Sequence, residues 1–142
     1  MRQPDVNLLL YAVDSSSPRH VAAKAWLEAR LSGTETVAFA WITLLGFVRI
    51  STRSSVFQRP LTPDQAFGLV REWLARPNVV TIDPTPGHAA TIARLLEPLG
   101  TAGNLVTDAH LAALAIEHGT TLESCDHDFG RFASLRWQDP LA

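Results

Sequence analysis

The sequence contains one cysteine, one lysine and no long apolar run. Because Cys125 has no partner, no internal disulfide can form, which favours a reducing compartment such as the cytoplasm. We interpret this lone residue, at the end of a predicted buried strand, as core filler and not as a nucleophile. No stretch approaches the ~20 apolar residues of a membrane span, and the N-terminus lacks the pattern of a secretory signal. We expect a soluble cytoplasmic protein without a membrane partner.

Repeats and low-complexity tracts are also absent, and charged residues make up only 18% of the chain. A globular chain of this length is expected to form one domain, here residues 1–142. The net charge of -2 argues against the general basic footprint of nucleic-acid-binding domains. Even so, Arg49, Arg53 and Arg59 fall close together. An acidic pocket beside an arginine rim would look neutral in total.

Short apolar runs alternate with helical patterns along the chain. The expected strands are one that ends at Asp5, Thr36–Ala40, Val79–Ile82, Thr120–Cys125 and Leu135–Trp137. The expected helices start at Ser17-Pro18, at Trp41, at a capping box on Thr62, at Thr85-Pro86 and at Asn104. Strands that are separated by helices throughout predict an α/β sandwich with a mainly parallel sheet.

Acidic residues recur where strands end and where a helix begins. Asp5 ends the first strand, and Asp108 lies one turn into the helix that Asn104 is expected to cap. Asp126 and Asp128 follow the buried strand. Taken singly, each acid has an ordinary explanation in the helix dipole or in turn chemistry. Together they would meet at the carboxyl ends of parallel strands, where a divalent cation such as Mg²⁺ or Mn²⁺ would neutralise their repulsion.

With these acids in place, the sequence resembles the PIN-domain nucleases, most closely the VapC-type toxins of bacterial toxin-antitoxin pairs. The matching segments span nearly the whole chain and read PDVNLLLYA, LLGFVRIST, GNLVTDAHLAALAIEHG, CDHDF and LRWQDPL. The resemblance implies a PIN-like three-layer α/β/α sandwich with a mainly parallel, roughly five-stranded sheet. It also implies a magnesium-dependent endoribonuclease toxin that acts on RNA, forms a homodimer and is inhibited by a cognate VapB-type antitoxin.

By this resemblance, Asp5, Asp108 and Asp126 match the metal-site acids of the family. Asp128 matches the second acid of the Asp-x-Asp-Phe segment, and we expect it to orient a water molecule or to accept its proton. Asn7 matches the polar residue that follows the first acid, and we expect it to contact the substrate. Metal-assisted hydrolysis requires no nucleophilic side chain, and the sequence shows no convincing Ser-His or Cys-His arrangement.

The arginines after the second strand are candidate RNA contacts. Arg49 and Arg53, with Phe57 and Arg59 on the following loop, would suit an RNA backbone and unpaired bases. A solvated helix face is the alternative interpretation of this group. Two histidines flank the acids and are expected to pack or to lie at the surface, with phosphate contact as the alternative: His110 and His127.

The sequence departs from the family at Gly46, where the family usually carries a glutamate on the helix after the second strand. This departure leaves a second hypothesis, a catalytically weakened PIN-like module that binds RNA or a protein partner. A receiver or phosphatase domain of similar topology is disfavoured, because the first strand lacks paired acids. The only lysine, Lys24, lies on an early helix, so such a domain's late-strand lysine is missing.

Overall fold

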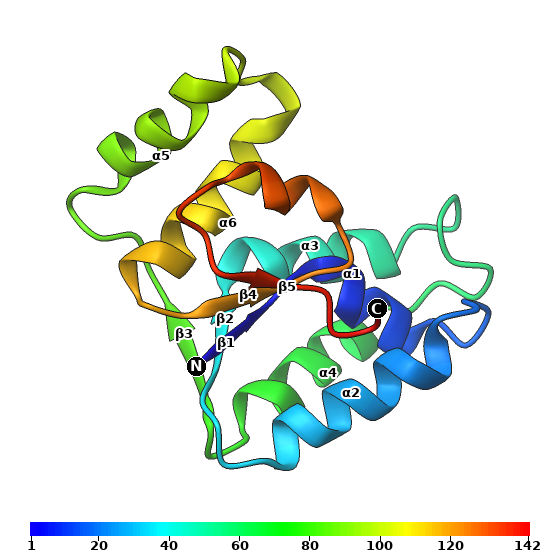
Figure 1. Ribbon diagram of the computed structural model, residues 1–142. Helices are drawn as coiled ribbons and strands as arrows, with labels where there is room; N and C mark the ends of the chain where they lie inside the picture. Colours follow the sequence, from blue (N-terminus) through cyan, green and yellow to red (C-terminus); the bar gives the residue numbers. More distant parts are fainter.

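The computed structural model describes residues 1–142 and contains one five-stranded sheet with the order β3-β2-β1-β4-β5 (Figure 1). All neighbouring strands are parallel, whereas the sequence predicted a mainly parallel sheet. The five predicted strands are present with adjusted ends: β1 (Arg2–Pro4), β2 (Val37–Ala40), β3 (Val79–Ile82), β4 (Thr121–Glu123) and β5 (Trp137–Gln138). Pro4 of β1 pairs with Glu123 of β4, so the next residues, Asp5 and Ser124, leave the sheet side by side.

Helices cover both faces of the sheet, which confirms the three-layer α/β/α sandwich (Figure 1). Four lie on one face: α1 (Val6–Val13), α2 (His20–Ser32), α3 (Trp41–Ser51) and α4 (Pro63–Leu74). On the other face lie α5 (His88–Leu96), α6 (Val106–Glu117) and the 3-10 helices η1 (Glu97–Leu99), η2 (Gly103–Leu105) and η3 (His127–Arg131). None of these helices has the length and apolar character needed to cross a membrane.

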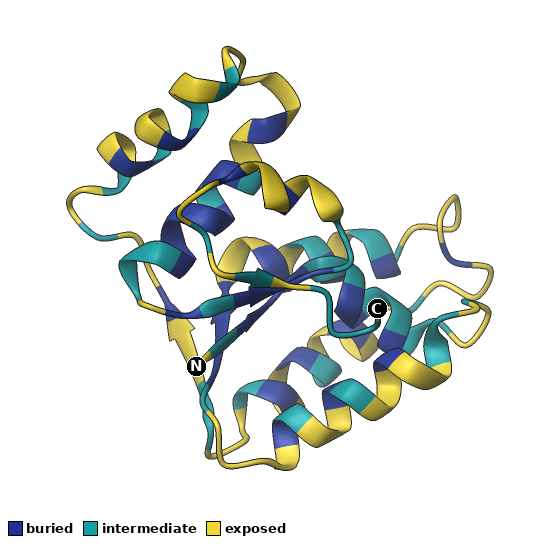
Figure 2. Cartoon of the chain, viewed as in Figure 1, coloured by how far each residue is buried: buried dark blue, intermediate teal, exposed yellow.

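The strand β2 divides the core because its side chains alternate between the two faces. Val37 and Phe39 pack with α1 to α4, whereas Ala38 and Ala40 pack with α5 and α6. Figure 2 shows the resulting pattern, with buried residues along β1, β2 and β4 and exposed residues on the outer helix surfaces and on β3.

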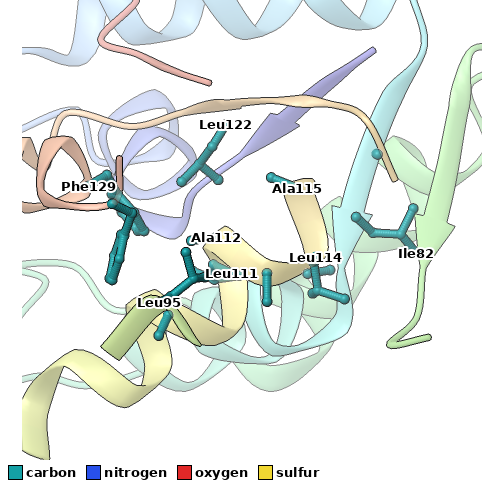
Figure 3. Close-up of a cluster of buried hydrophobic side chains, with 13 residues drawn as sticks. Ile82, Leu95, Leu111, Ala112, Leu114, Ala115, Leu122 and Phe129 are labelled. Carbon is teal, nitrogen blue, oxygen red and sulfur yellow. The ribbon is translucent and has the colours of Figure 1, made fainter. Parts of the chain in front are cut away.

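The helix α6 lies close to the sheet through a row of small residues. Its buried alanines include Ala112 and Ala115, which lie on the side of the helix that faces Leu122 of β4 (Figure 3). Larger side chains, such as Leu114 and Phe129, fill the space at the ends of this cluster. This close packing fixes α6, and therefore Asp108 in its first turn, against the acid-bearing end of β4.

The first helix was not predicted. The run of three leucines after Asp5 suggested only the end of a strand, but α1 begins immediately at Val6. Asp5 is its N-cap, and the carboxylate accepts a hydrogen bond of 2.7 Å from the Val6 amide. A short apolar run fits a buried strand or a buried helix equally well, so its local pattern could not decide between them.

Three predicted helix starts are also wrong. The helix α2 begins at His20, after an irregular turn at the predicted start. The helix α5 begins at His88 because the Thr85 amide and hydroxyl both donate to Glu117 instead of capping the helix. Asn104 lies in η2, so α6 begins at Val106 without a side-chain cap. By contrast, the predicted capping box is confirmed, with Thr62 and Gln65 exchanging hydrogen bonds of 2.9 and 3.1 Å.

Candidate functional site

A cavity of about 620 Å³ lies at the carboxyl end of the sheet. Three acids that come from different elements line it: Asp5 after β1, Asp108 in the first turn of α6, and Asp126 after β4. The sequence predicted that these three would meet, and the structure brings them together. The helix α3 contributes a mostly uncharged part of the wall, with Ile42, Thr43, Leu45, Gly46, Arg49 and Ile50.

Asp5 is the most constrained of the three acids. Only 7% of it is exposed, and both of its oxygens accept hydrogen bonds. One accepts from the Val6 amide at 2.7 Å and the other from the Ser124 hydroxyl at 2.8 Å. Burial raises the pKa of Asp5, the two hydrogen bonds oppose that change, and the charge of Asp126 adds to it. The carboxylate is therefore held in one orientation at the cavity wall.

Ser124 organises the site, and the sequence analysis missed it. Its fully buried hydroxyl donates to Asp5 and accepts from the Asp126 amide at 2.9 Å and from the Asn7 side-chain amide at 3.2 Å. The only available signal was a small hydroxyl residue at the end of a strand, two residues before an acid. Asn7 lines the cavity, as expected for a substrate contact, but its amide nitrogen is already bound within the protein.

The two acids after β4 differ in position. Asp126 lines the cavity, and one of its oxygens accepts a hydrogen bond of 2.9 Å from the Asp128 amide. Asp128 is exposed in η3 and does not line the cavity. Its charge still reaches the site, because it contributes to the raised pKa of Asp108. This position beyond the cavity wall is compatible with the predicted role beside a metal-bound water.

The pKa of Asp108 is raised well above the ordinary value of an aspartate. Burial is the largest cause, followed by the charges of Asp126, Asp5 and Asp128 in that order, and together they raise its pKa to about 6. Burial and the three nearby negative charges thus both favour the protonated form of this carboxyl group. No three of the histidine, cysteine and acidic side chains converge closely enough to form a ready metal-binding group. The carboxylates thus surround the cavity without closing on one point.

The predicted arginine cluster is divided in the structure. Arg49 lines the main cavity, but Arg53 is exposed at the end of α3 and does not line it. Arg59 borders a separate cavity of about 290 Å³ with Asp14. Phe57 is only 4% exposed, so its predicted role in contacting unpaired bases is wrong. The loop folds this aromatic ring inward because removing its apolar surface from water is favourable.

The other candidate groups have structural partners. His110 turns toward α5, where its Nδ1 lies 2.7 Å from Nε2 of His88, and His88 in turn bonds Glu117. Burial lowers the pKa of His110. His127 is exposed and bonds Asp139 at 3.1 Å. Burial, with the charge of Asp139, raises the pKa of Cys125 to about 11, so its thiol is a poor nucleophile.

Comparison with known proteins agrees with this arrangement. A family model described as PIN domain matches residues 4–135. The chain belongs to the PIN-domain family. Ribonuclease VapC37 of Mycobacterium tuberculosis is 49% identical over 142 residues, which cover 100% of this chain and 99% of that protein. The predicted membership is thus confirmed, and this relative places the chain in the VapC branch of the family.

Two solved structures share the fold of this chain. One is VapBC2 from Rickettsia felis bound to a DNA fragment from their promoter, with a TM-score of 0.69, 21% identity and 96% coverage of each chain. The other is a toxin-antitoxin complex from Klebsiella pneumoniae, with a TM-score of 0.62, 20% identity and coverage of 99% and 98%. At these identities the likeness shows the fold, and it confirms the predicted PIN-like sandwich.

The raised pKa of Asp108 predicts how stability depends on pH in metal-free protein. Its folded-state pKa of about 6 lies above the ordinary value of 3.8, so the folded state binds more protons than the unfolded state between these values. The free energy of unfolding should therefore fall as pH rises from about 4 to 6. Denaturant unfolding of metal-free parent and Asp108→Asn across this range measures the effect. For Asp108→Asn, the free energy of unfolding should depend less on pH and should be higher at pH 7 than in the parent. Asp64→Asn is the surface control. Equal pH dependence in the parent and in Asp108→Asn would contradict the raised pKa of Asp108.

Proposed function

We propose that this PIN-domain protein is a divalent-metal-dependent endoribonuclease toxin that hydrolyses phosphodiester bonds of RNA in the cytoplasm. The observation that carries the proposal is the set of three carboxylates, Asp5, Asp108 and Asp126, around one cavity. Their shared charge contributes to the raised pKa of Asp108. The name of ribonuclease VapC37, at 49% identity over the full chain, supports RNA as the substrate.

The donor set fits a hard divalent cation, because all three groups are carboxylates whose mutual repulsion a cation would relieve. Asp5, Asp108 and Asp126 would hold Mg²⁺, with Mn²⁺ as a substitute. A cation held by these acids would polarise a phosphoryl group of the RNA and lower the pKa of a bound water. Asp5 contributes a carboxylate that Ser124 already orients. Asp128, next to the cavity, is proposed to orient the attacking water or to accept its proton.

Contacts to the RNA are proposed from the residues around these acids. Arg49 lines the cavity from α3, where its guanidinium would bind a backbone phosphate and offset the repulsion between RNA and the acids. Arg53 lies one turn further along, outside the cavity, and would meet a neighbouring phosphate. Asn7 lines the cavity beside Asp5 and is proposed as a further contact. We propose that these elements act within one domain over residues 1–142.

A second candidate function depends on Gly46. This residue lines the cavity on α3, so the site lacks a carboxylate at the position where the resemblance leads one to expect a glutamate. The alternative is a weakly catalytic module that holds RNA or a protein partner. The cavity and its acids are common to both functions, and the strength of metal binding distinguishes them.

Replacing one acid tests the main proposal. Asp126→Asn should keep the fold but lose the rise in melting temperature that Mn²⁺ causes in the parent, because one of three ligand charges is gone. Cleavage of a cellular RNA pool should fall on the order of 100-fold or more, since a metal ion supplies several kcal/mol of transition-state stabilisation. Asp64→Asn, on the outer surface of α4, serves as the control. A mutant whose melting temperature still rises with Mn²⁺ as in the parent would exclude Asp126 as a ligand.

Gly46→Glu tests the second candidate. A β-carbon at this position would meet only Val6 Cγ2 at 3.6 Å, which is an ordinary contact, and the position lines the cavity. We expect the added carboxylate to tighten Mn²⁺ binding about tenfold, equivalent to about 1.4 kcal/mol, and to raise cleavage. Gly46→Gln is the matched control, because it has the same shape without the charge. Equal Mn²⁺ affinities for the two variants would show that the missing carboxylate does not limit the site.

We further propose a protein partner, a VapB-type antitoxin, and a homodimeric toxin. The structural relatives, VapBC2 and a toxin-antitoxin complex, support the antitoxin partner, and the homodimer follows from the family resemblance. In this chain, Trp41, Ile42 and Leu45 form an exposed apolar strip on α3, with exposed fractions of 43%, 42% and 52%. Ile42 and Leu45 also line the acidic cavity. A partner that places apolar residues on this strip could direct an arginine or lysine toward the acids.

Co-expression with the small reading frame next to the toxin gene tests the partner. A stable complex should form in which RNA cleavage is suppressed, and light scattering should give the mass of a toxin dimer with its antitoxins. Leu45→Glu should weaken the complex by several fold or more, because it places a charge in a contact between apolar surfaces. Val21→Glu is the control, since Val21 is 81% exposed on α2. If the parent toxin purifies without the partner, the proposed inhibition by an antitoxin is wrong.

A further inference from the structure

The C-terminal segment lies along the loop that carries two of the acids. We define the acid loop as residues 124–130 and the C-terminal brace as residues 137–139. The strand β5 pairs with β4 in parallel, beside the start of the acid loop (Figure 1). The Ser124 amide donates to the Gln138 carbonyl at 3.0 Å, and the Trp137 indole N–H donates to the Ser124 carbonyl at 3.1 Å. Both backbone polar groups of Ser124 are therefore held by the brace.

Further contacts extend along the loop. His127 Nε2 lies 3.1 Å from the Asp139 carboxylate, which is only 7% exposed. The His127 ring meets the Trp137 indole edge-on, with centroids 5.2 Å apart and planes at 68°. At Gly130, a β-carbon would lie 3.4 Å from Cζ3 of Trp137, so the indole lies against the loop backbone. The brace thus contacts the beginning, middle and end of the acid loop.

Ser124, which the brace holds, in turn fixes the positions of the acids through hydrogen bonds. The Asp126 amide donates to the Ser124 hydroxyl at 2.9 Å, and the Asp128 amide donates to the Asp126 carboxylate at 2.9 Å. The Ser124 hydroxyl also donates to Asp5. A displacement of Ser124 would therefore move Asp126 directly and would remove one of the two hydrogen bonds that orient Asp5. Neither Trp137 nor Asp139 lines the cavity.

We propose that Trp137 and Asp139 are positioning residues, which hold Asp126 and Asp128 in the geometry that the cation site requires. This inference rests on the proposed function, because it assumes that these acids serve a bound cation. Residues that orient metal ligands through hydrogen bonds usually contribute on the order of 10- to 100-fold to metal affinity or activity. Trp137 and Asp139 form hydrogen bonds with Ser124 and His127 and none with the carboxylates of Asp126 or Asp128. Their effect on these acids must therefore pass through the backbone of the acid loop.

Trp137→Phe removes the indole donor and keeps an aromatic ring in place. Trp26→Phe is the matched control, because Trp26 also donates its indole N–H next to the acid loop, to the Glu123 carboxylate at 3.3 Å. Glu123 keeps its two hydrogen bonds to Arg30 in that control. The measurements are the Mn²⁺ dissociation constant, kcat and KM for RNA cleavage, and amide hydrogen exchange of the metal-free protein.

For Trp137→Phe we expect the Mn²⁺ dissociation constant to rise about tenfold and kcat to fall by a similar factor, with KM little changed. In the metal-free protein, the Asp126 and Asp128 amides should exchange about tenfold faster, while amides of α4 should change no more than in Trp26→Phe. Trp26→Phe should lose stability without these local changes. If Trp137→Phe does not fold, Asp139→Ala, which removes the partner of His127, takes its place with the same expectations.

Equal Mn²⁺ affinity and equal loop exchange in the Trp137→Phe and Trp26→Phe variants would overturn the positioning role. So would faster exchange spread uniformly over the molecule, since that result describes a purely structural residue. A parent protein that binds no Mn²⁺ would contradict the proposed function instead. In that case the metal-free exchange still decides whether the brace holds the loop: a local rise at Asp126 and Asp128 supports it, and its absence overturns it.

Discussion

The geometry of the site depends on one buried hydroxyl group. Ser124 donates to Asp5 and accepts from the Asp126 amide and the Asn7 side chain. A hydroxyl has one proton and two lone pairs, so these three contacts use its full capacity. They can form only because β1 and β4 are parallel neighbours, which brings Asp5 and Ser124 off the sheet at the same point. The parallel pairing of β1 with β4 therefore determines where the acids lie.

The acids are gathered at a cost that the rest of the fold must offset. Burial raises the pKa of both Asp5 and Asp108, and the charge of Asp126 adds to the rise in each. Violations of ordinary rules of stability are expected at functional sites, where the arrangement serves binding and not folding. The nearby Glu123 shows the opposite case, because this fully buried carboxylate is paired with Arg30 by two hydrogen bonds. Asp5, Asp108 and Asp126, by contrast, take part in none of the salt bridges of the structure.

The local sequence predicted what depends on local chemistry. The capping box at Thr62 and the strand Val79–Ile82 were found as expected, because turn chemistry and apolar runs fix them. The meeting of Asp5 with Asp126 also followed, since all parallel strands end at the same edge. Ser124 could not be predicted, because its partner Asp5 lies 119 residues away in sequence. The predicted contact of Phe57 with unpaired bases was wrong for a similar reason, because only the tertiary fold shows that a polar loop turns this aromatic ring inward.

Gly46 lies within α3, where this helix forms part of the cavity wall. Glycine within a helix costs about 1 kcal/mol relative to alanine, so its presence calls for a physical reason. Steric necessity does not supply one, because a β-carbon would make only an ordinary contact with Val6. Main-chain freedom does not either, since Gly46 is not among the glycines with positive φ. Gly46 lines the cavity together with the acids and the apolar side chains of Ile42 and Leu45, and it contributes no side chain of its own. The cavity wall therefore combines carboxylates with apolar side chains, and position 46 adds no side chain to either group.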